Sequence, residues 1–234
     1  GSSKPKDLIY MVRGECRKAK RVGPTKINQA MNLIERAKNI LMTPKTEWDK
    51  IDNETPNVQS ILTTYVIPLV AIGAIASFIG WGFIGKSYSY GFVSIKVSGV
   101  SLGIKYAIIA LVGGIAGCYL LAVVIDALAP TFKSEKNFGK SFQLAAYSST
   151  AGWVGAVFNI LPSLAIIGSL VGLYGLYLLY IGLPKMKKTP QEQTTSYFVV
   201  SLVAMIVAYF VIGLILAAIL IGKNPISASD IKIN

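Results

Sequence analysis

Five long apolar segments constrain the fold of this chain more than any other feature. They cover residues 61–85, 106–129, 141–161, 163–183 and 197–222. As a helix, each segment is long enough to cross a hydrocarbon layer of about 30 Å. Of the 34 charged residues, 19 lie in residues 1–60 and only 12 in residues 61–222. A stretch with so few charges needs a bilayer around it. The sequence therefore predicts an all-α fold, a polytopic membrane bundle of five transmembrane helices.

The residues before the first apolar segment divide into two parts. Residues 1–30 are polar and basic without apolar periodicity, and we interpret them as a disordered or accessory extension. The opening Gly-Ser-Ser resembles an expression-tag remnant, and Met31 is a plausible natural start. No apolar core of a signal peptide follows this basic stretch. Residues 31–60 are predicted to form a cytoplasmic amphipathic segment, and residues 223–234 a short tail on the other side.

The amphipathic segment is recognised by one helical stripe of apolar residues, Leu33, Ile34, Ile40 and Leu41. Thr43-Pro44 should end this short helix and start a second one that carries Trp48. One interpretation places the helix in the cytoplasmic headgroup layer with Trp48 as an aromatic anchor. The other packs it on the protein's own cytoplasmic loops, and the stripe fits both equally well.

Two connections between the apolar segments have recognisable signals. Asn159 followed by Pro162 predicts a tight turn, so the third and fourth segments should form a helical hairpin. Residues 86–105 alternate in part, which fits a β-hairpin turning at Ser98-Gly99. They also fit an interfacial loop rich in aromatic residues, and the loop is the preferred interpretation.

The distribution of lysine and arginine predicts the orientation. With the N-terminus in the cytoplasm, the inner segments hold 18 of these residues and the outer segments 5. Without residues 1–30 the counts are 10 and 5, so the excess of positive charge stays on the same side. Because cytoplasmic loops are enriched in positive charge, we expect a cytoplasmic N-terminus and an external C-terminus. The net charge of +12 is then explained by anionic headgroups, and no nucleic-acid partner is expected.

The composition also excludes several kinds of chemistry. The chain has no histidine, which removes Ser-His-Asp and Cys-His nucleophiles and histidine metal sites. Cys16 and Cys118 are its only cysteines, so a disulfide framework or a paired-cysteine metal site is not available. We therefore expect no catalytic residues, no metal and no cofactor.

The candidate polar residues of the membrane segments form one small set. Asp126 lies three residues before the end of the second segment, and an ionisable group in a span is a candidate functional site. Its position near the cytoplasmic end favours a simple interfacial carboxylate that reaches water or pairs with Lys133 or Lys136. The third segment adds four consecutive polar residues, some of which must face protein or water. These are Tyr147, Ser148, Ser149 and Thr150.

Three motifs make the chain resemble a known family. The first is Pro-x-x-x-Trp-x-x-Ile-x-x-Glu, formed here by Pro44, Trp48, Ile51 and Glu54. The second is the run at residues 144–150 with Trp153, and the third is the tyrosine-rich run at residues 173–184. Over residues 31–222 the chain resembles the bacterial form of the Yip family of five-span membrane proteins. Ala151 stands where relatives often have proline, so a kink at this position is not implied.

The resemblance implies five spans, a cytoplasmic N-terminus and a bacterial cytoplasmic (inner) membrane location. Eukaryotic relatives act with Rab GTPases in vesicle trafficking, through a cytoplasmic domain with an Asp-Leu-Tyr-Gly-Pro motif. The nearest string here, Asp7-Leu8-Ile9-Tyr10, lacks the Gly-Pro, so this role transfers poorly. We expect a non-enzymatic scaffold whose partners are the bilayer and other membrane proteins or further copies of itself. The alternative is a small transporter or channel that uses Asp126 and the polar turn.

Overall fold

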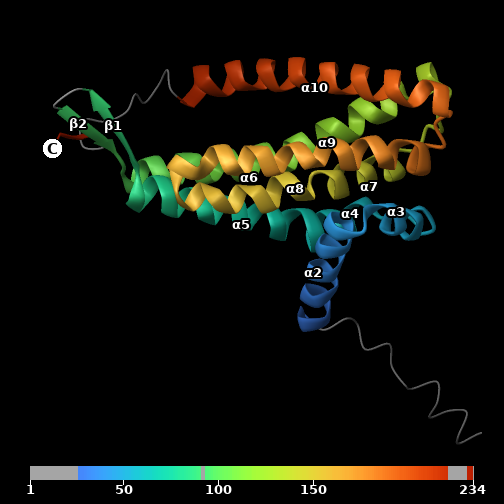
Figure 1. The fold of residues 1–234 in the computed structure, drawn as a ribbon, viewed down its shortest axis with the longest axis horizontal. Coiled ribbons are helices and arrows are strands. Elements are labelled where there is room, and N and C mark those ends of the chain that lie inside the picture. The colour runs from blue at the N-terminus through green and yellow to red at the C-terminus, as the bar shows by residue number, and fades with distance from the viewer. Residues whose placement is uncertain (1–25, 91–92, 221–230, 234) are drawn as a thin grey trace, which may run out of the picture.

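A computed structural model describes residues 26–90, 93–220 and 231–233 of this protein (Figure 1). Four helical stretches in this part are long and apolar enough to cross a membrane: Val58–Ile84, Val100–Phe132, Pro162–Lys187 and Gln191–Ile212. They lie side by side along one axis (Figure 1). The protein is therefore mostly helical, with four candidate membrane spans where the sequence predicts five.

The first span is helical throughout but changes its winding. It consists of α4 (Val58–Ile61), a π-helical turn (Leu62–Val66), α5 (Ile67–Ile79) and a second π-helical turn (Gly80–Ile84). Ile67 donates its N–H to the carbonyl of Leu62, five residues earlier. Pro68 follows directly and has no N–H to offer the preceding turn. The wider π turn thus accommodates the proline without breaking the span.

The third apolar segment is the one that does not form a single long helix. It consists of α7 (Phe138–Ser148), α8 (Thr150–Gly155) and a 3-10 turn (Ala156–Ile160). The break lies at Ser149, whose hydroxyl donates to the carbonyl of Ala145 at 2.7 Å. Serine in this arrangement competes with the backbone ladder of the helix. The prediction of one continuous third helix is therefore corrected to two short helices in succession.

The third and fourth segments form a helical hairpin, with the turn where the sequence predicts it. A 3-10 turn at Pro162–Leu164 leads into α9 (Ala165–Lys187), which packs on α8. The backbones touch at Gly155 and Gly168, where a Cβ on either glycine would lie 2.4 Å from the carbonyl oxygen of the other. Only glycine permits this separation, as in other close helix pairs of membrane proteins.

A three-stranded sheet closes one end of the bundle. Strands β1 (Lys86–Tyr90) and β2 (Val93–Val97) form an antiparallel hairpin, and β2 also pairs with β3 (Ile231–Ile233). The preference for a loop at residues 86–105 is therefore wrong, and the hairpin turns before Ser98-Gly99. Helix α6 (Val100–Leu128) starts directly after it, six residues earlier than predicted. The contact with β3 had no signal in the local sequence, because it joins segments far apart in the chain.

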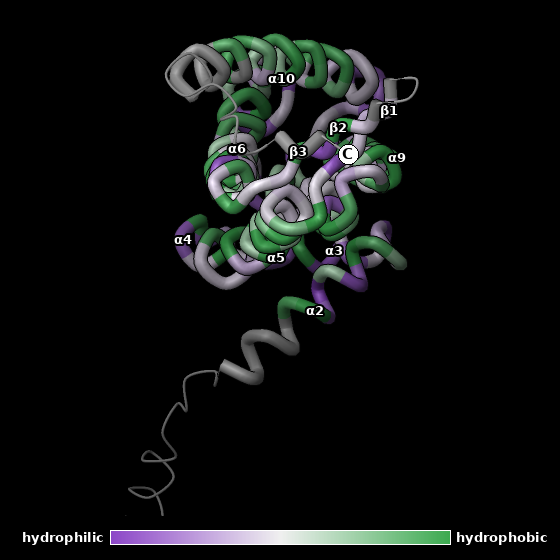
Figure 2. The backbone as a smooth tube through the Cα atoms, turned by 90° about the vertical axis from the view of Figure 1, so that its left-hand side faces the viewer, coloured by the Kyte–Doolittle hydropathy of each residue, from purple (hydrophilic) through white to green (hydrophobic). Residues whose placement is uncertain are grey.

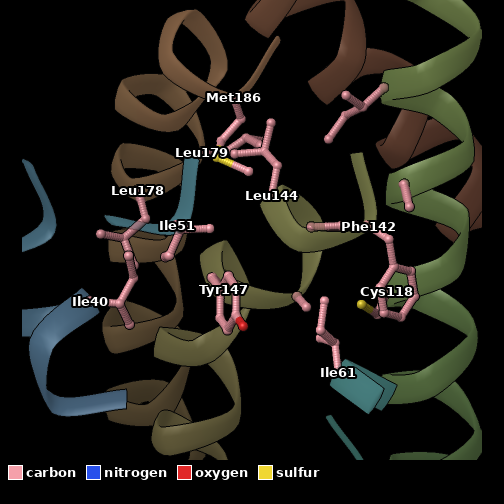
Figure 3. Close-up of a cluster of buried hydrophobic side chains, with 14 of the residues drawn as sticks. Ile40, Ile51, Ile61, Cys118, Phe142, Leu144, Tyr147, Leu178, Leu179 and Met186 are labelled. Atoms are coloured by element: carbon pink, nitrogen blue, oxygen red, sulfur yellow. The ribbon is translucent and has the colours of Figure 1, made fainter. Parts of the chain in front are cut away.

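The other end of the bundle carries the two N-terminal helices α2 (Lys26–Met42) and α3 (Pro44–Asp52). Helix α2 begins five residues before Met31, inside the stretch interpreted as an extension, while residues 1–25 lie outside the described part. Helix α10 (Gln191–Leu220) lies on the opposite side of the bundle from α2 (Figures 1 and 2). Ile40 of α2 and Ile51 of α3 join the core beside Leu178 of α9 (Figure 3).

Candidate functional site at the α3 end of the bundle

Helices α2 and α3, named the α2–α3 cap from here on, are fixed to the bundle mainly through α3. Pro44 is at the first turn of α3, where its missing N–H costs no hydrogen bond. At the other end of α3, the ammonium group of Lys140 donates to the carbonyls of Ile51, Asp52 and Glu54. A cation at this position binds carbonyls at the C-terminal end of the helix and complements the helix dipole.

Ion pairs add to this attachment of α3. Lys185, in the last turn of α9, pairs with Asp49 and also donates to the carbonyl of Lys45 at 2.8 Å. Lys188 and Lys140 both pair with Asp52. Each exposed pair contributes little alone, typically about 0–1 kcal/mol, but together they set the register of α3 on the bundle.

Trp48 gives the cap its apolar attachment. Its side chain has no exposed surface, and it meets the ring of Tyr147 edge to face at 6.4 Å. It also fills the space over Gly182 of α9, where a Cβ would lie 2.8 Å from the indole. Trp48 therefore does not reach the headgroup layer as the anchor that one sequence interpretation expected. It fastens the cap to its own protein.

The predicted apolar stripe of α2 is divided between two environments. Ile40 is fully buried, and Leu33 and Leu41 pack partly buried against the core. Ile34 is 64% exposed, and Met42 is exposed as well. Ile34, Lys38 and Met42 are four residues apart, so they lie on one outward face of the helix. The stripe thus has an inner edge in the bundle and an outer edge that the protein does not cover.

The buried carboxylate of Glu47, at the base of the cap, is neutralised by Arg36. The guanidinium of Arg36 donates to Glu47 at 2.8 Å and to Glu54, and it lies 5.6 Å from the centre of the Tyr147 ring. Glu47 is only 3% exposed. Burial acts to lower the pKa of Arg36, but its hydrogen bond to Glu54 and the nearby negative charges outweigh this effect and raise that pKa. Arg36 is thus the charge partner that lets Glu47 be buried.

Between the cap and the start of the first span lies a cavity of about 640 Å³, named the cap cavity. Its lining is largely polar and includes Glu35, Arg36, Lys50, Ser60, Gln143 and Tyr147. Gln143 is 1% exposed, and its Oε1 has no hydrogen-bond partner among the described residues. A buried amide without a partner costs about 1–3 kcal/mol, so its position in a cavity wall requires an explanation.

Asp126 has a partner that the sequence analysis missed. Its carboxylate accepts hydrogen bonds from Ser141 at 3.0 Å and from the ammonium of Lys187 at 3.2 Å. Lys187 has no exposed surface and also donates to the hydroxyl of Ser141 at 2.7 Å and the carbonyl of Asn137 at 3.2 Å. The expected partners Lys133 and Lys136 are therefore replaced by a buried lysine at the end of α9. The carboxylate lies beside the first turn of α7.

The four polar residues of the third segment serve three different purposes. Tyr147 lines the cap cavity. Thr150 shares a hydrogen bond of 2.7 Å with the hydroxyl of Tyr65 on the first span. Ser148 and Ser149 donate to the carbonyl of Ala145 on their own helix. The structure therefore brings only Tyr147 to the cavity and does not join the polar turn to Asp126.

The ion pairs of this end of the bundle neutralise buried charges and hold the helices in position. Among the described residues, no group of three or more Cys, Asp and Glu side chains is placed to hold a metal ion. Sequence reasoning missed Arg36, Lys187 and Gln143. Arg36 and Lys187 were counted only as cytoplasmic positive charge, and Gln143 lies in a segment interpreted as lipid-embedded. Lys187 stands beside Lys185 and Lys188 in the sequence, so no local signal separated the buried lysine from its exposed neighbours.

The comparisons with known proteins agree with the motifs. A family model described as "Yip1 domain" matches residues 38–220. Two curated relatives are both called "Inner membrane protein YohC", one from Escherichia coli strain K12 and one from E. coli O6:H1. Each is 26% identical over 157 residues, which is 66% of this chain and 80% of the relative. No solved structure matches this chain.

Proposed function

This chain belongs to the Yip1 domain family, and from that premise we propose that it is a non-enzymatic scaffold of the inner membrane. In this proposal it organises the membrane surface and partner proteins through the α2–α3 cap. The observation that carries the proposal is the placement of α2. The helix runs across the bundle axis near α4, where the first span begins, and its face with Ile34 and Met42 is uncovered (Figure 1).

A helix in that position would lie along the membrane surface. Its outward apolar residues would enter the boundary between headgroups and acyl chains, and Lys38 between them would reach the phosphates. Trp48, Arg36 and the α3 ion pairs hold the other side of the cap to the bundle. The cap would thus offer a surface of fixed shape where the membrane meets the cytoplasm.

The proposal includes five crossings. The α2–α3 cap and strand β3 lie at opposite ends of the bundle, and this arrangement supports an odd number of crossings (Figure 1). Residues 138–160 lie between the second and fourth stretches, and at 1.5 Å per residue they extend about 34 Å, enough to cross the hydrocarbon core. The broken helix α7–α8 is therefore the fifth crossing in this proposal.

The proposal also places the cap in the cytoplasm. Lys140, Lys185 and Lys188 lie at the cap end, where they pair with acidic residues of α3. These lysines are among those that predict the cytoplasmic side from the sequence. Both relatives carry the name of an inner membrane protein, which supports that membrane for this chain. The C-terminal strand β3 would then lie outside the cytoplasm.

The polar contacts weigh against the alternative of a transporter. A transport path normally has several polar groups near the middle of the membrane. Asp126 is instead neutralised by Lys187 near one end, and the hydroxyls of Ser148 and Ser149 bond to their own helix. Thr150 is joined to Tyr65.

Affinity purification from cross-linked membranes tests the scaffold role. The full chain should capture a reproducible set of membrane proteins or further copies of itself. The variant Ile34→Asp/Met42→Asp should lose most of this set while keeping the thermal midpoint of the wild type. The control is Phe210→Leu, which changes an exposed side chain of α10, on the opposite side of the bundle from α2 (Figure 1). Equal capture by wild type and by the α2 variant would contradict the proposal.

Reconstitution into proteoliposomes tests the alternative. We expect no flux of protons or small solutes above that of empty vesicles. A flux that Asp126→Asn abolishes, with the protein still folded by near-ultraviolet circular dichroism, would replace the scaffold proposal with transport.

A further inference from the structure

We propose that the cap cavity binds the phosphoethanolamine group, either as the headgroup of a phospholipid or as the free molecule. This inference rests on the placement of α2 at the membrane surface proposed above. The cavity, its charges and the unpartnered amide of Gln143 are independent of that placement. The volume of about 640 Å³ is within the roughly 300–1,000 Å³ of ordinary small-molecule sites.

The position of the cavity fits a headgroup. Its wall includes Ser60, Ile61 and Thr64, which are among the first residues of the span Val58–Ile84. The start of a span lies at the level of the polar headgroups. Leu33 and Ile61 give the lining an apolar part, against which the first carbons of an acyl chain can pack. A polar cavity at this level is reached from the lipid headgroup layer and from water.

The charges of the lining fit a zwitterion better than an anion. Three carboxylates, of Glu35, Glu47 and Glu54, face two cations. Arg36 already pairs with Glu47 and Glu54, whereas Glu35 makes no ion pair with any described residue. A bound ammonium group would restore the balance at Glu35. A phosphate on the same molecule would be placed near the cations, of which Lys50 pairs with Glu47 at 3.2 Å and has a side chain that is 64% exposed.

Gln143 supplies the second observation that points to a ligand. Its side chain lies in the wall almost without exposure, and its Oε1 has no partner among the described residues. An amide can rotate to exchange its oxygen and nitrogen, so it can accept from an N–H or donate to a phosphate oxygen. A primary ammonium has three N–H donors, enough for Gln143 and Glu35 together. A quaternary ammonium, as in choline, has none.

Native mass spectrometry of the full chain in detergent tests the proposal with defined lipids. The probes are phosphatidylethanolamine, phosphatidylcholine and phosphatidylglycerol with identical acyl chains. We expect one phosphatidylethanolamine to bind at least about tenfold more tightly than either other lipid, because only it brings both the N–H donors and the phosphate. Equal affinity for the three lipids would overturn the proposal.

Variants test whether the bound lipid is in the cap cavity. Gln143→Leu keeps the approximate volume and removes the unpartnered amide, so the protein should remain folded. Together with Glu35→Gln it should weaken phosphatidylethanolamine binding by about tenfold or more and leave phosphatidylglycerol binding unchanged. The matched control is Glu192→Gln, which alters an exposed carboxylate at the start of α10. Unchanged phosphatidylethanolamine affinity in the double variant would overturn the assignment.

Competition with free O-phosphoethanolamine distinguishes the two sources of the group. Displacement of the lipid at millimolar concentration means that the cavity accepts the soluble molecule as well. Retention of the lipid, with its headgroup preference and its dependence on Gln143, assigns the site to phospholipid alone. The contact of α2 with the membrane is measured separately, by lipid-borne quenchers. A failure of that placement is therefore distinguishable from a failure of headgroup binding.

Discussion

The indole of Trp48 lies directly over Gly182, so that any side chain on this glycine would meet the ring within 3 Å. Trp48 comes from the helix before the first span and Gly182 from the end of α9. The contact joins the cap to a position on α9 that has no side chain. Because the ring fits only where α9 has no side chain, this contact fixes the position of α3 along α9.

This contact predicts that Gly182→Ala destabilises the protein. The added methyl group would force Trp48 and Leu144 apart, at a cost of about 1–3 kcal/mol. The control is Gly113→Ala on α6, where a Cβ meets nothing within 4 Å and alanine favours the helix. Thermal unfolding in detergent and the rate of trypsin cleavage at Lys45 report the two effects. Equal midpoints for both variants would contradict the packing of Trp48 on Gly182.

The buried pair of Lys187 and Asp126 predicts an asymmetric set of variants. Asp126→Asn leaves the ammonium of Lys187 without a counter-charge, and breaking a buried pair typically costs about 3–5 kcal/mol. The double variant Asp126→Asn/Lys187→Met removes the stranded charge and should recover part of that loss. Equilibrium unfolding of the three proteins in mixed micelles measures the difference. Additive effects would show that the two groups do not interact.

The inner and outer edges of α2 should respond differently to the same substitution. Ile40→Asp places a charge in the fully buried core and should release the cap, seen as rapid proteolysis near Lys38. Ile34→Asp changes a side chain that is 64% exposed, so the cap should stay attached. A fluorophore on Lys38→Cys should then lose its quenching by brominated lipids in the Ile34→Asp protein. Persistent quenching would place α2 away from the membrane.

Impermeant thiol reagents test the orientation of the bundle. In a background without Cys16 and Cys118, Ser89→Cys in strand β1 should be labelled in cells whose outer membrane alone is opened. Thr46→Cys in α3 should be labelled only after the inner membrane is permeabilised. Both side chains are exposed, so their access to the reagent is comparable. The reverse pattern would place the cap outside.

Much of the fold is visible in the sequence because apolar length and turn residues are local signals. The first, second, fourth and last apolar segments correspond to the candidate spans, and the turn between the third and fourth is where Asn159 and Pro162 predict it. The break at Ser149 was not predicted, although the polar run around it was noticed. Hydrophobicity measures whether a segment can enter a membrane, and it does not measure whether its backbone ladder is continuous.

The candidate site was harder to predict from the sequence because its residues interact in pairs whose two members lie far apart in the chain. Asp126 was identified as unusual, but its partner Lys187 follows 61 residues later and looks like any loop lysine. Without that partner, Asp126→Asn is expected to be harmless, and with it the same change strands a buried charge. Trp48 likewise looked like a membrane anchor, since only the shape of α9 at Gly182 shows that the ring is covered.

The pairing of β3 with β2 has a consequence for the order of assembly. Ile233 aligns with Ile95, but β2 precedes the second span and β3 follows the last one. During synthesis one edge of β2 therefore remains unpaired until every later helix has been made and inserted. Contacts between such distant parts of a chain form late, because the intervening loop must first be closed. The third strand can thus complete the sheet only after the whole bundle has been inserted. A chain halted after any earlier span would leave that edge open to other strands.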